Sequence, residues 1–172
     1  LLPLLIALMI ACAGLYVFIF QADTRQSQLF FLVAQIGGMV IAAGSVSVIA
    51  PFVYDFLFGV LTWWLTPLLI HFHLYFPLPD QLTSFRRILA ALYAAAAIGS
   101  LFQFFCFMYG IRAGQLFPMF YVLRRAWLVI GLAGVLFLLI RTSTGKTALE
   151  TRKQSGLVTL GAMLAIIPFV CF

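Results

Sequence analysis

Six long apolar segments, separated by short polar or proline-containing breaks, dominate this sequence. They cover about residues 1–20, 29–50, 52–76, 88–109, 121–140 and 157–172. A bilayer core about 30 Å thick is crossed by about 20 helical residues, so segments of this length are candidate transmembrane helices. Transmembrane β-strands are shorter and alternate in polarity, which these segments do not. The sequence therefore predicts an all-α fold, a polytopic integral membrane helix bundle of about six transmembrane helices forming a single domain over residues 1–172.

The charge content also favours a membrane protein. Hydrophobic residues make up 65% of the chain and charged residues 8%, whereas a soluble domain has roughly 25% charged residues. The net charge of +6 does not indicate nucleic-acid binding, because the basic residues lie in the breaks between apolar segments, where they face lipid headgroups. We expect membrane lipid and other transmembrane helices as partners, the latter from missing segments, a second copy or other subunits.

The ends of the chain and one internal break affect how many helices are expected. The chain begins at Leu1 without Met and ends at Phe172 inside an apolar segment, so we expect it to be truncated at both ends. Between the second and third segments only Pro51, Tyr54 and Asp55 interrupt the apolar sequence. Proline is favoured at the first position of a helix. We therefore favour a tight helical hairpin at Pro51 over the alternative of one long kinked span.

Basic residues are unevenly divided between the two ends of the predicted helices. The breaks on one side carry seven of them: Arg25, Arg86, Arg87, Arg141, Lys146, Arg152 and Lys153. The breaks on the other side carry three: Arg112, Arg124 and Arg125. Because cytoplasmic loops carry the excess of Lys and Arg, the side with seven is predicted to be cytoplasmic. We expect a multi-pass protein of the inner (cytoplasmic) cell membrane.

The fifth segment and the small residues lead to two further expectations about packing. The fifth segment is long enough to span only if its helix includes Arg124 and Arg125, whose side chains would then extend to the membrane interface.

Small residues recur at four-residue spacing and predict faces on which helices approach closely. They are Ala34, Gly38 and Ala42, and Ala43 and Ser47, in the second segment, and Ala90 and Ala94 in the fourth, where the run 94-AAAA-97 and Gly99 continue the small residues.

Two histidines, His71 and His73, stand near the end of the third segment in 67-PLLIHFHLYFPLP-79. On a helix they are separated by about 200° and do not share a face, whereas two helical metal ligands are typically four residues apart. We predict no metal site and no cofactor, although a haem or chlorin bound axially by His71 stays an alternative. We favour hydrogen bonds from both imidazoles to backbone or water, near the carbonyl group that Pro67 leaves free.

Three side chains are candidates for a sensing or interfacial role. One is His73: a free imidazole titrates near neutral pH, and ionisable groups within membrane segments are candidate functional groups. Asp55 is an acid inside an apolar stretch; we favour an interfacial position for it, because it lies at the predicted hairpin, and the alternative is a basic partner within the bundle. Arg112 lies in the outward loop, where an external signal would be met.

Catalytic patterns are not found in the sequence. It contains no Ser-His-Asp constellation, no pair of carboxylates and no H-E-x-x-H motif. The stretch 141-RTSTGKTALE-150 ends like a phosphate-binding loop, but the required first glycine is Ile140 and the preceding segment is apolar. We therefore predict no catalytic residues and expect the chain not to be an enzyme.

Two stretches carry a resemblance to a known family. They read Pro67-x-x-x-His71-Phe72-x-x-x-Phe76-Pro77, and Arg152-x-Gln154 followed by Gly161 and Pro168-Phe169. Both patterns resemble the membrane sensor region of bacterial multi-helix sensor histidine kinases of the ComP type, over roughly residues 52–172. The family often has a second basic residue two positions after the glutamine, where this chain has Gly156, and the kinase part is absent.

The resemblance implies a function in signal transduction. The chain would be the non-catalytic, signal-sensing transmembrane region of a two-component sensor histidine kinase, which biases an attached kinase. The alternative from the residues alone is an accessory transmembrane subunit of a larger respiratory or photosynthetic energy-converting complex.

Overall fold

The computed structural model describes residues 2–21, 23–46, 51–75, 82–108 and 116–144. Apart from residues 21, 23 and 24 between the first two helices, these residues form α1 (Leu2–Phe20), α2 (Arg25–Val46), α3 (Pro51–Tyr75), α4 (Leu82–Met108) and α5 (Leu116–Thr144). By length and composition, each of the five is able to cross a membrane. The all-α helical fold is confirmed for this part of the chain. The sixth predicted segment, residues 157–172, lies outside the described residues and stays a prediction.

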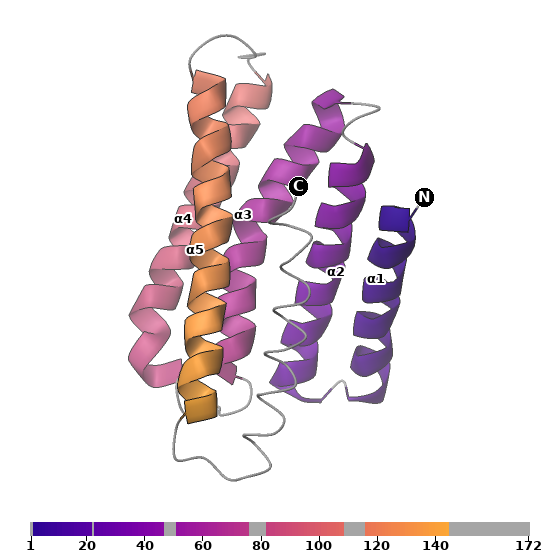
Figure 1. The fold of residues 1–172 in the computed structure, drawn as a ribbon, viewed down its shortest axis with the longest axis vertical. Helices are drawn as coiled ribbons and strands as arrows, with labels where there is room; N and C mark the ends of the chain where they lie inside the picture. The colour runs from indigo at the N-terminus through magenta and orange to yellow at the C-terminus, as the bar shows by residue number, and fades with distance from the viewer. Residues whose placement is uncertain (1, 22, 47–50, 76–81, 109–115, 145–172) are drawn as a thin grey trace.

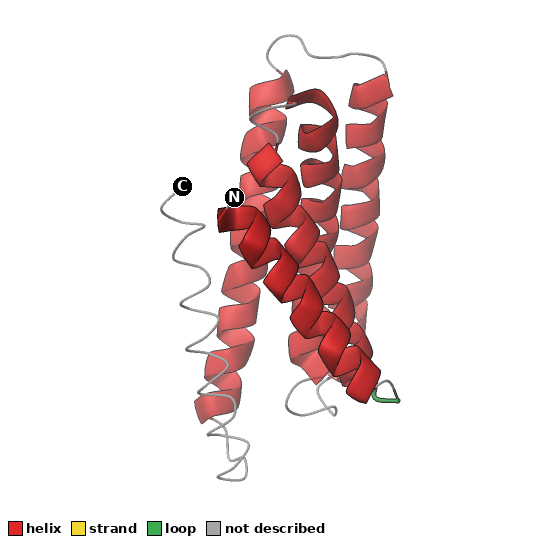
Figure 2. Cartoon of the chain, turned by 90° about the vertical axis from the view of Figure 1, so that its right-hand side faces the viewer, coloured by secondary structure: helices red, strands yellow, loops and turns green. Residues whose placement is uncertain are grey.

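Helix α3 occupies the centre of the bundle. Figure 1 shows α1, α2 and α3 side by side, with α4 and α5 next to α3 on the side away from α1. Cα atoms come within 8 Å of each other between α1 and α2, between α2 and α3, and between α3 and both α4 and α5. Helix α1 is inclined to the other helices, as the turned view in Figure 2 shows. Among the described helices, α3 therefore has the largest number of neighbours.

The helices begin at residues suited to helix starts. Thr24 precedes α2, and its Oγ1 accepts a hydrogen bond of 3.2 Å from the Ser27 amide, which is the arrangement of an N-cap. Helix α3 begins at Pro51, as predicted from the preference of proline for the first helical position. Helices α2 and α3 are separate and pack against each other, so the structure has a hairpin here and not one kinked span.

Small residues bring α1 and α2 close together. Ala34 and Gly38 are buried, as the four-residue spacing predicted. A Cβ atom added to Gly38 would lie 2.9 Å from the carbonyl oxygen of Ala7. Gln35 also donates a hydrogen bond of 2.9 Å to the carbonyl oxygen of Ala11. The close approach of the two backbones therefore depends on the missing side chain of Gly38.

The predicted small-residue face of α4 is confirmed only in part. Ala90 and Ala94 are exposed, whereas Ala96 and Gly99 are buried. Gly99 lies against the Trp63 indole of α3. The four-residue spacing alone does not show which of these small residues face α3.

Most apolar side chains on the outside of the bundle are exposed. On α1 only Ala7 and Gly14 are buried, while large residues such as Leu8 and Tyr16 are more than half exposed. An apolar exterior of this extent requires lipid or protein around it. It agrees with the predicted membrane placement of the bundle.

Candidate functional site

Two groups of polar side chains lie near opposite ends of α3. Asp55 of α3, Gln103 of α4 and Arg124 of α5 form the ion-pair cluster near its first residues. Arg25 of α2, His71 and Tyr75 of α3 and their neighbours form the basic notch near its last residues. In both groups, side chains of α3 contact side chains of neighbouring helices. Helix α3 therefore connects the ion-pair cluster with the basic notch.

Arg124 and Asp55 form an ion pair within the bundle. Arg124 Nη2 lies 3.4 Å from Asp55 Oδ1, and the side chains are 6% and 35% exposed, respectively. The guanidinium also lies over the rings of Phe58, at 4.9 Å, and Tyr121, at 5.4 Å. A carboxylate and two aromatic faces together offset the cost of burying this charge.

The ion pair bears on the predictions for Arg124 and for Asp55. Arg124 does not extend to the interface; it points to α3 because Asp55 and Phe58 provide partners there. Only Arg125 is exposed, and it lies over the Tyr121 ring at 4.3 Å. For Asp55, the structure has the basic partner that was the less favoured alternative, while its side chain is still 35% exposed near the start of α3.

Gln103 is the member of the cluster that sequence reasoning missed. Its side chain is 8% exposed, and Nε2 lies 3.4 Å from the carbonyl oxygen of Asp55 and 3.5 Å from that of Phe56. Gly59 provides the space, since a Cβ there would overlap the Gln103 amide. Gln103 Oε1 has no hydrogen-bond partner among the described residues. A lone glutamine in the apolar run 101-LFQFFCFM-108 was a signal for this site.

Near its middle, α3 is hydrogen-bonded to α5 through Trp63, Thr66 and Trp127. Proline has no N–H, so Pro67 cannot donate to the carbonyl oxygen of Trp63 four residues earlier. That oxygen accepts a hydrogen bond of 3.1 Å from Trp127 Nε1. In return, the Thr66 hydroxyl lies 3.4 Å from the Trp127 carbonyl oxygen, as a hydrogen-bond donor. The carbonyl group freed by Pro67 was predicted to need a partner, and that partner comes from α5.

The two histidines have different partners, in agreement with their predicted separation around the helix. His73 Nδ1 lies 2.8 Å from the carbonyl oxygen of Leu69 in its own helix, which is the predicted backbone bond. His71 Nδ1 instead lies 3.0 Å from the hydroxyl of Tyr93 on α4. For His71 the structure adds a side-chain partner that the sequence did not predict, because Tyr93 presents a hydroxyl group across the helix interface.

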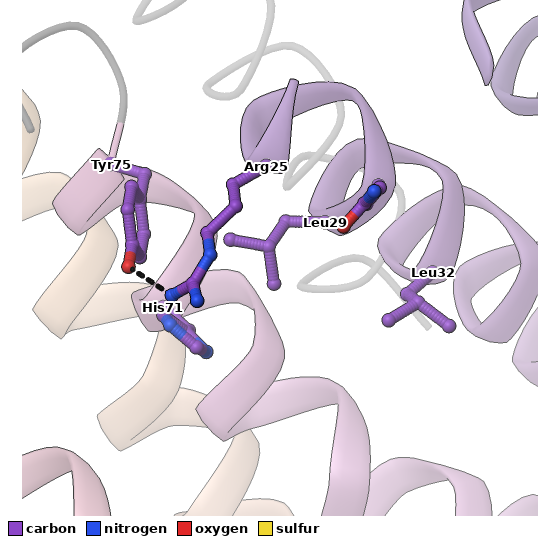
Figure 3. Close-up of a pocket in the computed structure, with 6 residues that line it drawn as sticks. Arg25, Leu29, Leu32, His71 and Tyr75 are labelled. Carbon is purple, nitrogen blue, oxygen red and sulfur yellow. Dashed lines mark hydrogen bonds between the residues drawn. The ribbon is translucent and has the colours of Figure 1, made fainter. Parts of the chain in front are cut away.

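His71 also lines the basic notch, a cavity of about 210 Å³ between α2 and α3. Its lining residues are Arg25, Gln28, Leu29, Leu32, His71 and Tyr75. Arg25 Nη1 donates a hydrogen bond of 3.1 Å to the Tyr75 hydroxyl, and Figure 3 shows this guanidinium beside the His71 ring. Gln26 Nε2 donates to the Tyr75 carbonyl oxygen at 3.0 Å. The start of α2 is therefore fixed to the end of α3.

The described residues offer little to a metal or a large cofactor. No group of three or more His, Cys, Asp or Glu that could hold a metal ion occurs among them. The notch beside His71, at about 210 Å³, is smaller than the roughly 300–1,000 Å³ of typical small-molecule and cofactor pockets. The haem or chlorin alternative therefore finds no support at His71.

The structure places only part of the family pattern. Pro67, His71 and Phe72 lie on α3, and the Phe72 ring packs against Phe30 of α2 at 5.8 Å. Several predicted site or motif residues lie outside the described part of the chain: Phe76, Pro77, Arg112, Arg152, Gln154, Gly161 and Pro168.

No family model, curated protein or solved structure matches the chain. The resemblance to sensor kinases therefore depends on the sequence patterns alone.

Proposed function

We propose that this chain is a non-catalytic membrane module that receives a signal and biases an attached histidine kinase of a bacterial two-component system. The sequence resemblance suggests this class of protein. The observation that carries the proposal is the ion pair between Asp55 of α3 and Arg124 of α5, in which the arginine is buried and the carboxylate is partly exposed. Because the Asp55 carboxylate is partly exposed, a ligand or a change in the membrane could reach it and alter its pairing with the buried Arg124.

The geometry suggests how such a signal would be transmitted. Charge-assisted N–H···O bonds are typically about 2.7–2.9 Å long, whereas the two guanidinium nitrogens of Arg124 lie 3.4 and 3.5 Å from Asp55 Oδ1. The pair is therefore loose in this arrangement. A tighter pair, or a separated one in which Gln103 supplies the acceptor, would shift α5 relative to α3. A signal acts by stabilising one of these arrangements over the other.

Helix α3 would carry the change across the membrane. It contacts α2, α4 and α5, and it connects the ion-pair cluster with the basic notch. The tryptophan and threonine bonds hold α5 against α3 near the middle of both helices, so a shift of α5 at the Asp55 end would pivot about this contact. A displacement at the Asp55 end would therefore reach the end at which α5 finishes, near Arg141.

A specific surface feature favours the alternative, an accessory subunit of an energy-converting complex. An apolar groove of about 420 Å³ lies between α3 and α4. It is lined by Phe56, Val60, Trp64, Ala97, Ser100, Leu101 and Phe104. In such a complex the groove would receive an apolar part of a neighbouring subunit or of its pigment.

One experiment separates the two functions. The natural protein is purified from its own membrane in mild detergent, its chain length and partners are determined by mass spectrometry, and it is incubated with radiolabelled ATP. The sensor proposal predicts a kinase on the same chain and label on a histidine. A stoichiometric set of cofactor-bearing subunits without a kinase would overturn it and support the accessory subunit.

A further inference from the structure

The basic notch has the chemistry of an anion site. It combines the guanidinium of Arg25 and the ring of His71 with the side chains of Gln28 and Tyr75, all of which can donate hydrogen bonds. None of its lining residues is a carboxylate. Within the described residues, Arg25 has the neutral Tyr75 hydroxyl as its partner and forms no ion pair. A cation held in place without a carboxylate is suited to bind an anion.

The position of Arg25 adds to this preference. Arg25 is the first residue of α2, so the positive end of the helix dipole lies beside the notch. The fork of donors on a guanidinium matches the oxygen atoms of a phosphate group. The Tyr75 bond holds the fork against α3, and the Tyr93 bond fixes the His71 ring behind it. Two of the donors are therefore in place before any ligand arrives.

The apolar part of the lining shows which kind of phosphate fits. Leu29 and Leu32 line the notch further along α2, and Leu32 is 43% exposed on the outside of the bundle. The site is thus polar towards the end of the bundle and apolar towards its middle. A phospholipid has the same order, with a polar headgroup at the membrane surface and apolar chains below it. The start of α4 and the end of α5 lie at the same end of the bundle as the start of α2 (Figure 1), and they carry Arg86, Arg87 and Arg141. The positive-inside rule places the cytoplasmic leaflet with its anionic lipids at this end.

We propose that the notch between Arg25 and His71 binds a phosphate group, that of an anionic phospholipid whose acyl chains lie along Leu29 and Leu32. Arg25 contacts the phosphate oxygens, and His71 donates from the ring nitrogen that Tyr93 does not engage. The same chemistry would accept free phosphate, so the test compares the two sources.

The natural protein in neutral detergent is titrated with short-chain phosphatidylglycerol, short-chain phosphatidylcholine and inorganic phosphate, and its melting temperature is followed. A bound ligand stabilises the folded state in proportion to its occupancy. We expect stabilisation by phosphatidylglycerol at about tenfold lower concentration than by phosphatidylcholine, a factor that corresponds to about 1.4 kcal/mol. Equal stabilisation by inorganic phosphate would show that the site takes free phosphate.

Variants show whether the notch is responsible. Arg25→Gln should raise the required phosphatidylglycerol concentration about tenfold, and Arg25→Lys should have a smaller effect, because it keeps the charge and loses the fork. Arg87→Gln is the matched control, since Arg87 is an exposed arginine at the same end and lies outside the notch. Equal losses in Arg25→Gln and Arg87→Gln, or no preference for phosphatidylglycerol in the unaltered protein, would overturn the proposal.

Discussion

The carbonyl oxygen of Trp63 accepts a hydrogen bond of 3.1 Å from the indole nitrogen of Trp127, and this bond replaces the one that Pro67 cannot make. The two indole rings also pack together, with their centroids 5.4 Å apart. A proline inside a membrane helix is thus accommodated by a donor from a neighbouring helix. The same contact fixes α5 against α3 between the two polar groups.

This relationship predicts coupling between Pro67 and Trp127. Trp127→Phe keeps an aromatic ring but leaves the Trp63 carbonyl without a donor, which should cost about 1 kcal/mol. In a Pro67→Ala background the amide of residue 67 can bond to that carbonyl, so the same substitution should cost less. Thermal unfolding in detergent of the four proteins of this double-mutant cycle measures the difference. Identical costs of Trp127→Phe in both backgrounds would show that the carbonyl does not need the indole.

Two adjacent glycines of α2 allow a matched test of helix packing. A Cβ on Gly38 would lie 2.9 Å from the Ala7 carbonyl oxygen, whereas one on Gly37 would have nothing within 4 Å. Gly38→Ala should therefore destabilise the protein by about 1–3 kcal/mol. Gly37→Ala should be neutral or stabilising by up to about 1 kcal/mol, because alanine favours helix. Comparable melting temperatures for the two variants would contradict the close packing of α1 on α2.

The ion pair predicts non-additive effects on stability. Asp55→Asn leaves the buried Arg124 without a counter-charge, and Arg124→Gln removes the buried charge itself. We expect Asp55→Asn to cost about 1–3 kcal/mol, less than a fully buried pair would, because Asp55 is 35% exposed. The double variant should be no less stable than Asp55→Asn alone. Additive losses in thermal unfolding would show that the two side chains act independently.

The uneven distribution of arginines predicts the orientation in the membrane. In a protein whose three natural cysteines are replaced by alanine, Asp23→Cys and Arg87→Cys should react with an impermeant maleimide only after the cells are permeabilised. Met108→Cys, at the opposite end of the bundle, should react in intact cells. The reverse pattern of labelling would invert the orientation derived from the positive-inside rule.

The sequence was sufficient for the helices but not for the contacts between them. Apolar length predicted five segments that form helices, and the preference of proline for helix starts predicted the first residue of α3. The separation of His71 and His73 followed from helical geometry alone. These properties are local, because they depend on residues within one or two turns of the same helix.

The contacts of the candidate site could not be predicted in the same way. Whether Arg124 extends to the interface or turns inward depends on Asp55, which is distant in sequence and is brought near by the packing of α5 on α3. Likewise, the partner of His71 is Tyr93 of α4, and Gly99 of α4 is buried against Trp63 of α3. Each of these outcomes depends on the rotation of one helix about its axis relative to another, and the apolar pattern of these nearly uniform helices does not encode that rotation clearly.

The most direct test of the proposed function is the rate of histidine autophosphorylation of the natural protein in membrane vesicles. Asp55→Asn and Arg124→Gln should each change this rate in the same direction, by roughly fivefold or more, and the double variant should change it no further. Gly37→Ala, which has no packing neighbour at its Cβ position, is the control and should leave the rate unchanged. A natural protein that incorporates no phosphate, or one whose rate is unaffected by both substitutions, would contradict a sensor module that acts through the Asp55–Arg124 pair.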